Sequence, residues 1–192
     1  MGGEGASRLV NPGAFLDRDG TINVDSGYVA SPDLLEFTPG AIDAIRTLNR
    51  RGYSIAVITN QAGVARGFHT ESDVDAFHAE MSRQLALADA HIDRFYYCPH
   101  HEEGTVEPYA IQCDCRKPAD SLYRRAISEL DLDPTKSIVV GDKPGDLTPA
   151  IALGAKGVLI VPQAHVDHPT VEECPFQRAG DLHSAVGQLL GL

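Results

Sequence analysis

Short apolar segments alternate with amphipathic segments along most of this chain, and this alternation limits the folds that it can adopt. Several segments have the length and composition of buried strands: residues 14–16, 53–59, 95–97, 137–141 and 157–161. Helical spacing of apolar residues marks the segments that follow them: residues 39–50, 71–88, 121–130, 146–153 and 182–190. Strands that alternate with helices form right-handed β-α-β units. The sequence therefore predicts an α/β fold around a central, mostly parallel sheet.

The length of the chain, 192 residues, suits one domain with a sizeable core. Its first residues are polar and rich in Gly, without the hydrophobic stretch of a secretory signal. We expect residues 1–12 to form a flexible N-terminal tail and residues 13–192 to form a single domain. No apolar run is long enough to cross a bilayer, so we expect a cytoplasmic protein.

The formal net charge of −11 bears on the partners of the chain. A strongly acidic surface repels nucleic acid and anionic membranes, and we expect neither as a partner. A small anionic substrate would need a local cluster of cations to overcome this field. No stripe of residues suggests an interface between copies, so we expect a monomer.

Polar residues stand where the predicted strands end. In a parallel sheet these carboxyl ends meet at one edge, and that edge is where ligands bind. The strand-end residues are Asp17, Thr59-Asn60, Asp142-Lys143 and, after a long irregular segment, Arg116-Lys117. We expect them to form one site.

Asp17 and Asp19 are two carboxylates that leave the first strand in the same direction. One can attack phosphorus, and the other can give a proton to the leaving oxygen and later take one from water. The alternative is that Asp17-Arg18-Asp19-Gly20 is only a polar turn. That alternative does not explain the polar residues at the other strand ends.

Two carboxylates that face a phosphate need a hard cation between them. Mg²⁺ prefers oxygen ligands and keeps several waters and phosphate oxygens in its shell. We expect Asp17 and Asp142 to supply carboxylate ligands and the main-chain carbonyl of Asp19 to supply a third. Thr59 and Lys117 would hold the equatorial phosphate oxygens.

Soft ligands cluster in the long irregular segment from residue 98 to residue 118. They are Cys98, His100, Cys113 and Cys115. Three thiolates and one imidazole suit tetrahedral Zn²⁺ with no open position, which indicates a structural metal. His101 is an alternative to His100, and a reduced cysteine cluster is the alternative to zinc. Zinc would fix the backbone that carries Arg116 and Lys117. We expect Cys174 to be an ordinary core thiol.

The order of these motifs, Asp-x-Asp-x-Thr, strand-end Thr, Lys and Gly-Asp, resembles that of the haloacid dehalogenase-like phosphatases. Residues 15–23 resemble the branch that acts on histidinol phosphate and heptose bisphosphate. The resemblance implies a Rossmann-like three-layer sandwich with a minimal cap. It also implies a nucleophile at Asp17, a proton donor at Asp19, phosphoryl-stabilising groups at Thr59 and Lys117, and a Mg²⁺ site completed by Asp142.

Residues 97–101 and 113–118 resemble the heptose branch, since histidinol-phosphate enzymes tend to have a shorter spacer between the two pairs of soft ligands. Residues 23–29 and 59–67 also resemble the heptose branch. That resemblance implies hydrolysis of the C7 phosphate of a heptose bisphosphate, a small sugar phosphate, on the route to nucleotide-activated heptose. The implied substrate-binding residues are Asp25, Ser26, Gly27, Tyr28, Asn60, Gln61, Ala62, Arg116 and Lys143.

Several alternatives stay open from the sequence. Histidinol phosphate or another phosphomonoester could use the same residues, and Asp25 to Tyr28 could be a surface turn. Arg66 is either a further phosphate contact or a solvated loop cation. A chain of this kind could also be a phospho-aspartate receiver or a zinc-stabilised binding module without turnover.

Overall fold

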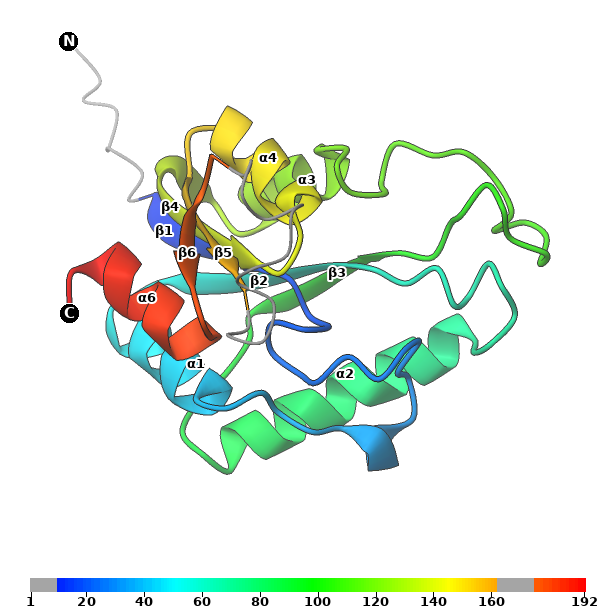
Figure 1. Cartoon of the computed structure of the whole chain (residues 1–192), viewed down its shortest axis with the longest axis horizontal. Helices are drawn as coiled ribbons and strands as arrows, with labels where there is room; N and C mark the ends of the chain where they lie inside the picture. Colours follow the sequence, from blue (N-terminus) through cyan, green and yellow to red (C-terminus); the bar gives the residue numbers. More distant parts are fainter. Residues whose placement is uncertain (1–9, 162–174) are drawn as a thin grey trace, which may run out of the picture.

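The computed structural model describes residues 10–161 and 175–192, and a six-stranded sheet forms its centre (Figure 1). The strand order is β3-β2-β1-β4-β5-β6, and each neighbouring pair is parallel. The strands are β1 (Asn11–Leu16), β2 (Ser54–Asn60), β3 (Arg94–Cys98), β4 (Leu132–Gly141), β5 (Lys156–Ile160) and β6 (Gln177–Ala179).

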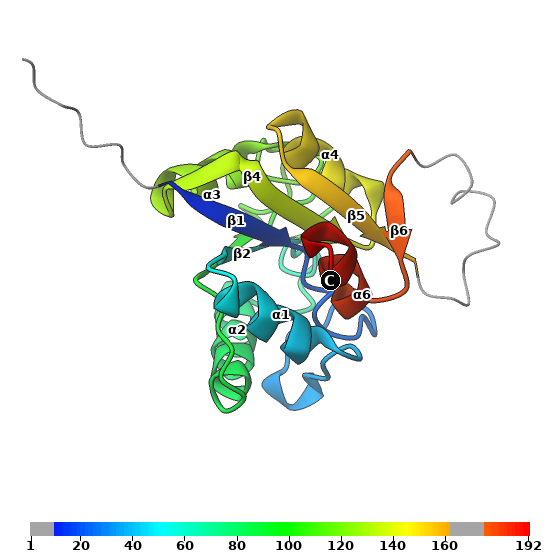
Figure 2. The same cartoon turned by 90° about the vertical axis from the view of Figure 1, so that its left-hand side faces the viewer.

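Helices cover both faces of this sheet (Figure 2). One face carries α1 (Ala41–Arg50), α2 (Glu71–Ala86) and α6 (Leu182–Leu190). The other face carries α3 (Ser121–Glu129) and α4 (Pro144–Ala152). A short 3-10 helix, η1 (Pro32–Leu34), lies in the connection between β1 and α1. The predicted α/β fold with a parallel sheet is confirmed.

Helices can pack on both faces of the sheet because successive side chains of β1 point to opposite faces. Ala14 and Leu16 pack into the core that contains α1 and α2, whereas Phe15 points the other way and meets Tyr123 of α3 edge to face at 5.5 Å. All of these side chains are 1% exposed or less. Burial of one such large apolar side chain contributes about 1.5–3 kcal/mol. Both layers of helices are therefore held by apolar contact with the same strands.

Several boundaries differ from those expected from the sequence. β1 begins at Asn11, so Asn11 and Pro12 pair with β4 and do not belong to the expected tail of residues 1–12. The sequence does not predict β6, because three residues, of which only Ala179 is apolar, give no periodic signal. Cys174, the expected core thiol, lies outside the described residues. None of the described helices is both long and apolar enough to cross a membrane.

The long irregular segment, expected over residues 98–118, spans residues 99–120 between β3 and α3 and forms the extended green loop in Figure 1. Contacts with the start of α2 and the connection before it hold this loop in place. The backbone N–H groups of Thr105 and Val106 both donate to the carbonyl of Ala65, at 2.7 and 3.0 Å. The Tyr109 hydroxyl donates to Glu71 Oε1 at 2.6 Å. The loop therefore packs beside the segment that follows β2.

Candidate active site and Cys/His loop

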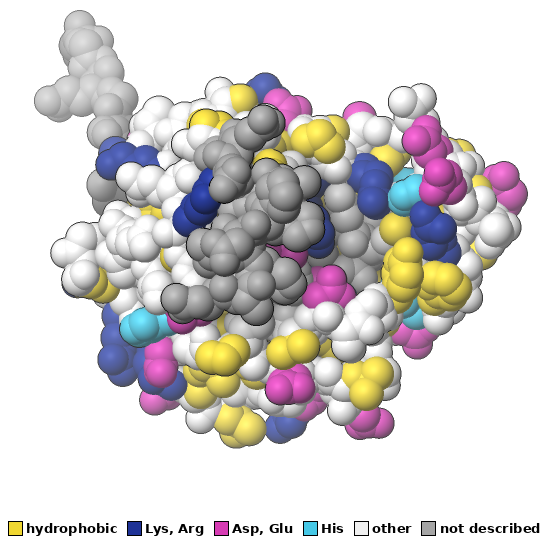
Figure 3. Space-filling model, in the orientation of Figure 1, with side chains coloured by type: hydrophobic (Ala, Val, Ile, Leu, Met, Phe, Trp, Pro, Cys, Tyr) yellow, Lys and Arg dark blue, Asp and Glu magenta, His cyan; other side chains and the backbone are white. Residues whose placement is uncertain are grey.

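The strand-end residues gather around one cleft of about 370 Å³. On the right-hand part of Figure 3, basic, acidic and histidine side chains stand beside a hollow in this face of the molecule. Most of the expected site residues line the cleft: Asp17, Asp19, Asp25, Gly27, Tyr28, Thr59, Asn60, Gln61, Ala62, Arg116, Lys117 and Lys143. Ser26 and Asp142 are not among the lining residues, whereas Gly63, Arg66, His101 and Asp146 are. The structure therefore brings most of the expected residues together.

Asp17 and Lys117 form a buried ion pair at the base of the cleft. Lys117 Nζ donates to Asp17 Oδ1 and to the Ile58 carbonyl, each at 2.6 Å, and lies 2.8 Å from Asp146 Oδ1. Burial raises the pKa of Asp17 to about 7, although Lys117 acts to lower it. Burial acts to lower the pKa of Lys117, but the carboxylates of Asp17 and Asp146 more than offset this effect and raise it. Lys117 is therefore a fixed positive charge beside Asp17.

Asp17, Asp142 and Asp146 form a carboxylate cluster in which one oxygen of each lies within 4.8 Å of the others. Burial raises the pKa of Asp142, and its Oδ1 atom is buried without a hydrogen-bond partner. Gly20 has a φ of +79°, and a Cβ there would lie 2.7 Å from Asp142 Oδ2. Three oxygens with an unpartnered buried lone pair fit a hard divalent cation. Asp146 was not among the expected ligands.

Asp19 is held from three sides. Arg18 donates to both of its carboxylate oxygens at 2.9 Å, Asn23 Nδ2 donates to Oδ1 at 3.0 Å, and Gln61 Nε2 donates to Oδ2 at 2.9 Å. Gln61 Nε2 also donates to Thr59 Oγ1 at 2.9 Å. The expected proton donor and the expected phosphate-binding hydroxyl are thus joined through one amide group.

Asn60 is expected to bind substrate, and in the structure its side chain holds the backbone of Lys117. Its Nδ2 donates to the Lys117 carbonyl at 3.2 Å, and its Oδ1 accepts from the Lys117 N–H at 3.0 Å. This pair of bonds joins the end of β2 to the end of the long loop. The position of the Lys117 backbone therefore does not depend on the Cys/His cluster alone.

His78 of α2 lies behind this network, stacked on Phe95 with 4.3 Å between ring centroids. Burial, assisted by the positive charge of Arg18, lowers the pKa of His78 from 6.5 to about 3. Its pKa is depressed in the folded chain, so only the unfolded chain takes up a proton as the pH falls below 6.5. Neutral His78 thus contributes stability that is present above that pH and is lost below it.

We therefore expect the free energy of unfolding to fall as the pH is lowered from about 6.5 towards 5. In this range His78 gains a proton in the unfolded chain but stays neutral in the folded chain. Urea titrations at several pH values measure this slope. The variant His78→Gln has no such proton and should show a flatter profile in this range. A slope that is the same in both proteins would contradict the assignment.

The segment from Asp25 to Tyr28 forms one rim of the cleft. The Gly27 N–H donates to Asp25 Oδ1 at 2.9 Å, and Tyr28, with a φ of 51°, lies edge to face against Phe68 at 4.7 Å. This segment therefore contacts the connection that follows β2. Arg116 also lines the cleft, and its Nη1 lies 3.5 Å from the carbonyl of His100. Arg66 lines the cleft and also pairs with the exposed Glu103 at 3.1 Å.

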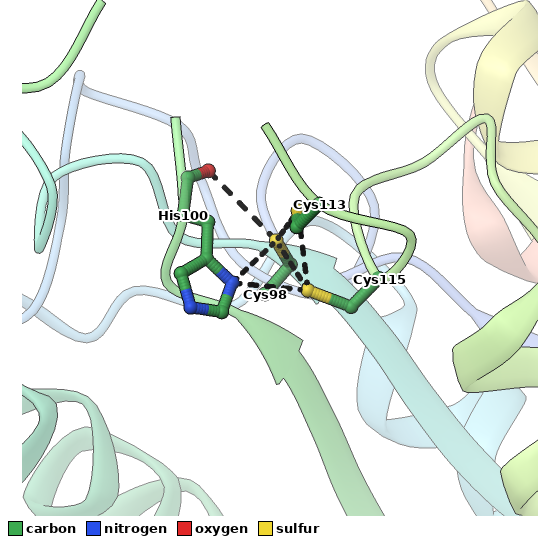
Figure 4. Close-up of side chains that lie close together, drawn as sticks. All are labelled: Cys98, His100, Cys113 and Cys115. Atoms are coloured by element: carbon green, nitrogen blue, oxygen red, sulfur yellow. Dashed lines mark hydrogen bonds between the residues drawn. The ribbon is translucent and has the colours of Figure 1, made fainter. Parts of the chain in front are cut away.

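Cys98, His100, Cys113 and Cys115 converge on one point at the base of the long loop (Figure 4). His100 Nδ1 lies 3.2 Å from Cys115 Sγ, and Cys98 Sγ lies 2.9 Å from Cys115 Sγ. One ligand atom from each residue lies within 4.8 Å of the others. His101, the alternative ligand, lines the cleft instead, and its Nδ1 accepts from the Glu103 N–H. The cluster is consistent with a tetrahedral zinc site.

The sheet, the carboxylate cluster and the strand-end Lys117 together define a known class of enzyme. Residues 12–154 match the family model of the haloacid dehalogenase-like hydrolases. The chain belongs to this family.

Curated relatives refine this assignment. The chain is 46% identical over 152 residues to D-glycero-beta-D-manno-heptose-1,7-bisphosphate 7-phosphatase of Haemophilus influenzae, covering 79% of this chain and 82% of the relative. It is 47% identical over 141 residues to the Escherichia coli K12 protein of the same name, covering 73% and 74% of the two chains. Within the hydrolase family, the chain is a phosphatase that belongs with these heptose-bisphosphate phosphatases.

Solved structures agree with this placement. A putative haloacid dehalogenase-like phosphatase from Mesorhizobium loti has a TM-score of 0.80 and 34% identity, over 94% of this chain and 85% of the other. The D,D-heptose 1,7-bisphosphate phosphatase of B. bronchiseptica also has a TM-score of 0.80, with 31% identity over 94% and 98% of the two chains. The latter was crystallised with magnesium and phosphate.

Proposed function

We propose that the enzyme hydrolyses the C7 phosphate of D-glycero-β-D-manno-heptose 1,7-bisphosphate and leaves the heptose 1-phosphate, in the biosynthesis of nucleotide-activated heptose. The observation that carries the proposal is the 46% identity to a phosphatase named for this reaction, over 82% of its length. The cleft supports it, because its lining includes Asp17 and Asp146 of the carboxylate cluster together with Lys117, Lys143 and Arg116. A metal site and several cations suit a substrate with two phosphate groups.

The reaction proceeds in two transfers at the base of the cleft. A carboxylate oxygen of Asp17 attacks phosphorus, and the bond between phosphorus and the C7 oxygen breaks as Asp19 gives its proton to that oxygen. Asp19 then takes a proton from water, the water oxygen attacks phosphorus, and inorganic phosphate leaves as Asp17 is restored. Thr59 and Lys117 hold the phosphoryl oxygens throughout.

Asp17, Asp142 and Asp146 would hold Mg²⁺ with the main-chain carbonyl of Asp19. When bound, the ion neutralises the carboxylates and the phosphate oxygens so that like charges can approach. The unpartnered Asp142 Oδ1 atom and the magnesium in the B. bronchiseptica enzyme support this assignment.

The remainder of the substrate would lie beside the rim formed by residues 25–28. We assign the sugar to the rim of Asp25, Ser26, Gly27 and Tyr28 and to the loop residues Asn60, Gln61 and Ala62. Arg116 and Lys143 would contact the distal phosphate or the sugar. In this proposal the fold is a Rossmann-like three-layer sandwich with a minimal cap. Residues 13–192 form one domain, and the protein is a cytoplasmic monomer.

A phosphate-release panel tests the proposal. The purified enzyme with Mg²⁺ is given both anomers of the heptose bisphosphate, histidinol phosphate and simple sugar monophosphates. The value of kcat/KM should be highest for the β anomer. A clear preference for histidinol phosphate would show that the proposed substrate is wrong, but it would leave the proposed chemistry unchanged. Absence of release from every ester by the folded protein would favour a phospho-aspartate receiver or a binding module.

We also propose that zinc at the Cys/His cluster positions Arg116. The contact between Arg116 Nη1 and the carbonyl of His100 links this side chain to a ligand of the cluster. Lys117 is held separately, through the two hydrogen bonds to Asn60. Loss of zinc should therefore disturb substrate binding more than the chemical step.

The variant Cys113→Ser should lose zinc and raise KM for the bisphosphate by roughly tenfold, equivalent to about 1.4 kcal/mol of binding, with a smaller change in kcat. Metal analysis and steady-state kinetics measure the two effects. Asp114→Asn changes an exposed neighbour and serves as the control. If Cys113→Ser loses zinc but keeps full catalytic efficiency, the link between the cluster and Arg116 is wrong.

A further inference from the structure

Arg18 lies between the two aspartates of the motif, yet its side chain is completely buried. Its Nη2 donates to both carboxylate oxygens of Asp19 at 2.9 Å, and its Nε donates to Oδ1 at 3.0 Å. The same Nη2 also donates to the carbonyl of Val29 at 2.8 Å. Burial of a guanidinium is costly unless it is paired, so these contacts mark a site that is built around this cation.

Helix α2 forms the other wall of the Arg18 site. Arg18 Nη1 donates to His78 Nε2 at 3.3 Å, and the guanidinium lies over the ring of Phe77, 4.6 Å from its centroid. The stack of His78 on Phe95 fixes the imidazole plane. Since burial keeps His78 neutral, its Nε2 can accept this hydrogen bond.

The bond to the Val29 carbonyl extends the network to the rim of the cleft. Val29 directly follows Tyr28, which lines the cleft. One guanidinium group therefore contacts the Asp19 carboxylate, the end of the rim and helix α2 at once. Gln61 and Asn23 complete the set of donors to Asp19.

We propose that Arg18 is a positioning residue that aims the Asp19 carboxyl group at the leaving oxygen of the substrate, and that His78 holds Arg18 in place. This inference rests on the proposed role of Asp19 as the proton donor. A bidentate guanidinium allows little rotation of the carboxyl group about its Cβ–Cγ bond. Without the bonds from Arg18, the Asp19 carboxyl group can still transfer a proton, but it is no longer aligned with the leaving oxygen.

The consequence depends on the alcohol that leaves. When phosphorus bonds to Asp17, a sugar alkoxide must receive a proton as the P–O bond breaks, because it is a poor leaving group. A nitrophenolate leaves readily as an anion and needs little help. Misalignment of Asp19 should therefore slow the transfer from a sugar phosphate and spare the transfer from an aryl phosphate.

The test compares kcat/KM of the Mg²⁺-loaded enzyme for a sugar phosphate and for p-nitrophenyl phosphate. For His78→Leu and Arg18→Lys we expect a fall of roughly 10- to 100-fold with the sugar phosphate, part of the 10²–10⁴-fold that a proton donor contributes. With p-nitrophenyl phosphate the fall should be several times smaller. If Arg18→Lys fails to fold, His78→Leu carries the test, because it leaves the buried cation and its carboxylate partner intact.

Leu85→Ala on the same helix is the matched control, since Leu85 is fully buried but belongs to the apolar core and not to the Arg18 network. It should lose stability and reduce turnover of both substrates alike, if at all. An equal fall for both substrates in His78→Leu, or no fall for either, would overturn the positioning role. Wild-type enzyme that releases no phosphate would instead overturn the proposed function, so the two failures are distinguishable.

Discussion

Asp17→Asn is expected to abolish turnover, with kcat lowered on the order of 10⁴- to 10⁶-fold, the range seen when an enzyme loses a nucleophile or its partner. The amide cannot form the acyl phosphate, and its nitrogen cannot bind a hard cation. The fold should survive, because Lys117 keeps its contacts with the Ile58 carbonyl and Asp146. Rapid acid quench with labelled substrate should trap phosphoenzyme in the wild type and none in the variant.

Contamination is the main concern for such a large effect. Asn at position 17 can deamidate and restore the wild type, so mass spectrometry must accompany the kinetics. Asp17→Ala, which cannot revert, serves as the second variant. Turnover near the wild-type value in a preparation free of restored Asp17 would contradict the covalent route.

Lys117→Met is expected to cost both stability and activity. The ammonium group touches two buried carboxylates, and removal of one partner from a buried ion pair costs about 3–5 kcal/mol. Loss of the donor that we propose for the phosphoryl oxygens should lower kcat by about 10²–10³-fold. Urea unfolding with EDTA measures the first effect and steady-state kinetics the second. Added Mg²⁺ should restore part of the stability, because it supplies positive charge to the same carboxylates.

Lys143→Met provides the comparison. Lys143 lies 3.3 Å from Asp142 Oδ2, but its side chain is 65% exposed. Exposed ion pairs contribute about 0–1 kcal/mol, so this variant should unfold almost as the wild type does. Equal loss of stability in both lysine variants would show that burial of the Lys117 ion pairs does not increase their contribution to stability.

The sheet and the edge that carries the site could be predicted, because both depend on local signals. Buried strands give runs of apolar residues, and parallel connection brings their ends together, so Asp17, Thr59 and Asp142 could be expected in one cleft. The Cys/His cluster was predictable for a similar reason. Cysteine and histidine are metal ligands by residue type, so two such pairs in one segment can be recognised from the sequence alone.

Asp146 was missed although a signal existed. Asp146 follows Asp142 at a spacing of four residues and stands at the start of the predicted helix 146–153. The helix begins earlier than expected, at Pro144, so that Asp146 lies in its first turn. The Asp146 side chain also accepts from the Lys143 N–H at 2.9 Å and closes that turn. A search for carboxylates one helical turn apart would have found it.

Arg18 and His78 could not be found from local pattern. An arginine between two aspartates is typical of a solvated turn, and a lone histidine in an amphipathic helix has no distinctive spacing. Their 60-residue separation in the chain is closed only by the packing of α2 against the sheet. Tertiary packing, and no sequence motif, creates the buried network behind Asp19.

The three short contacts of the Lys117 ammonium group have a consequence for the order of events. An ammonium has three N–H bonds, and here Asp17, the Ile58 carbonyl and Asp146 already occupy all three directions. An incoming phosphate oxygen can therefore be received only in exchange for one of these acceptors. In the proposed reaction the phosphate would take the place of Asp17 Oδ1 at the ammonium group while Asp17 attacks phosphorus, so that one exchange of partners would both receive the phosphate and free the nucleophile.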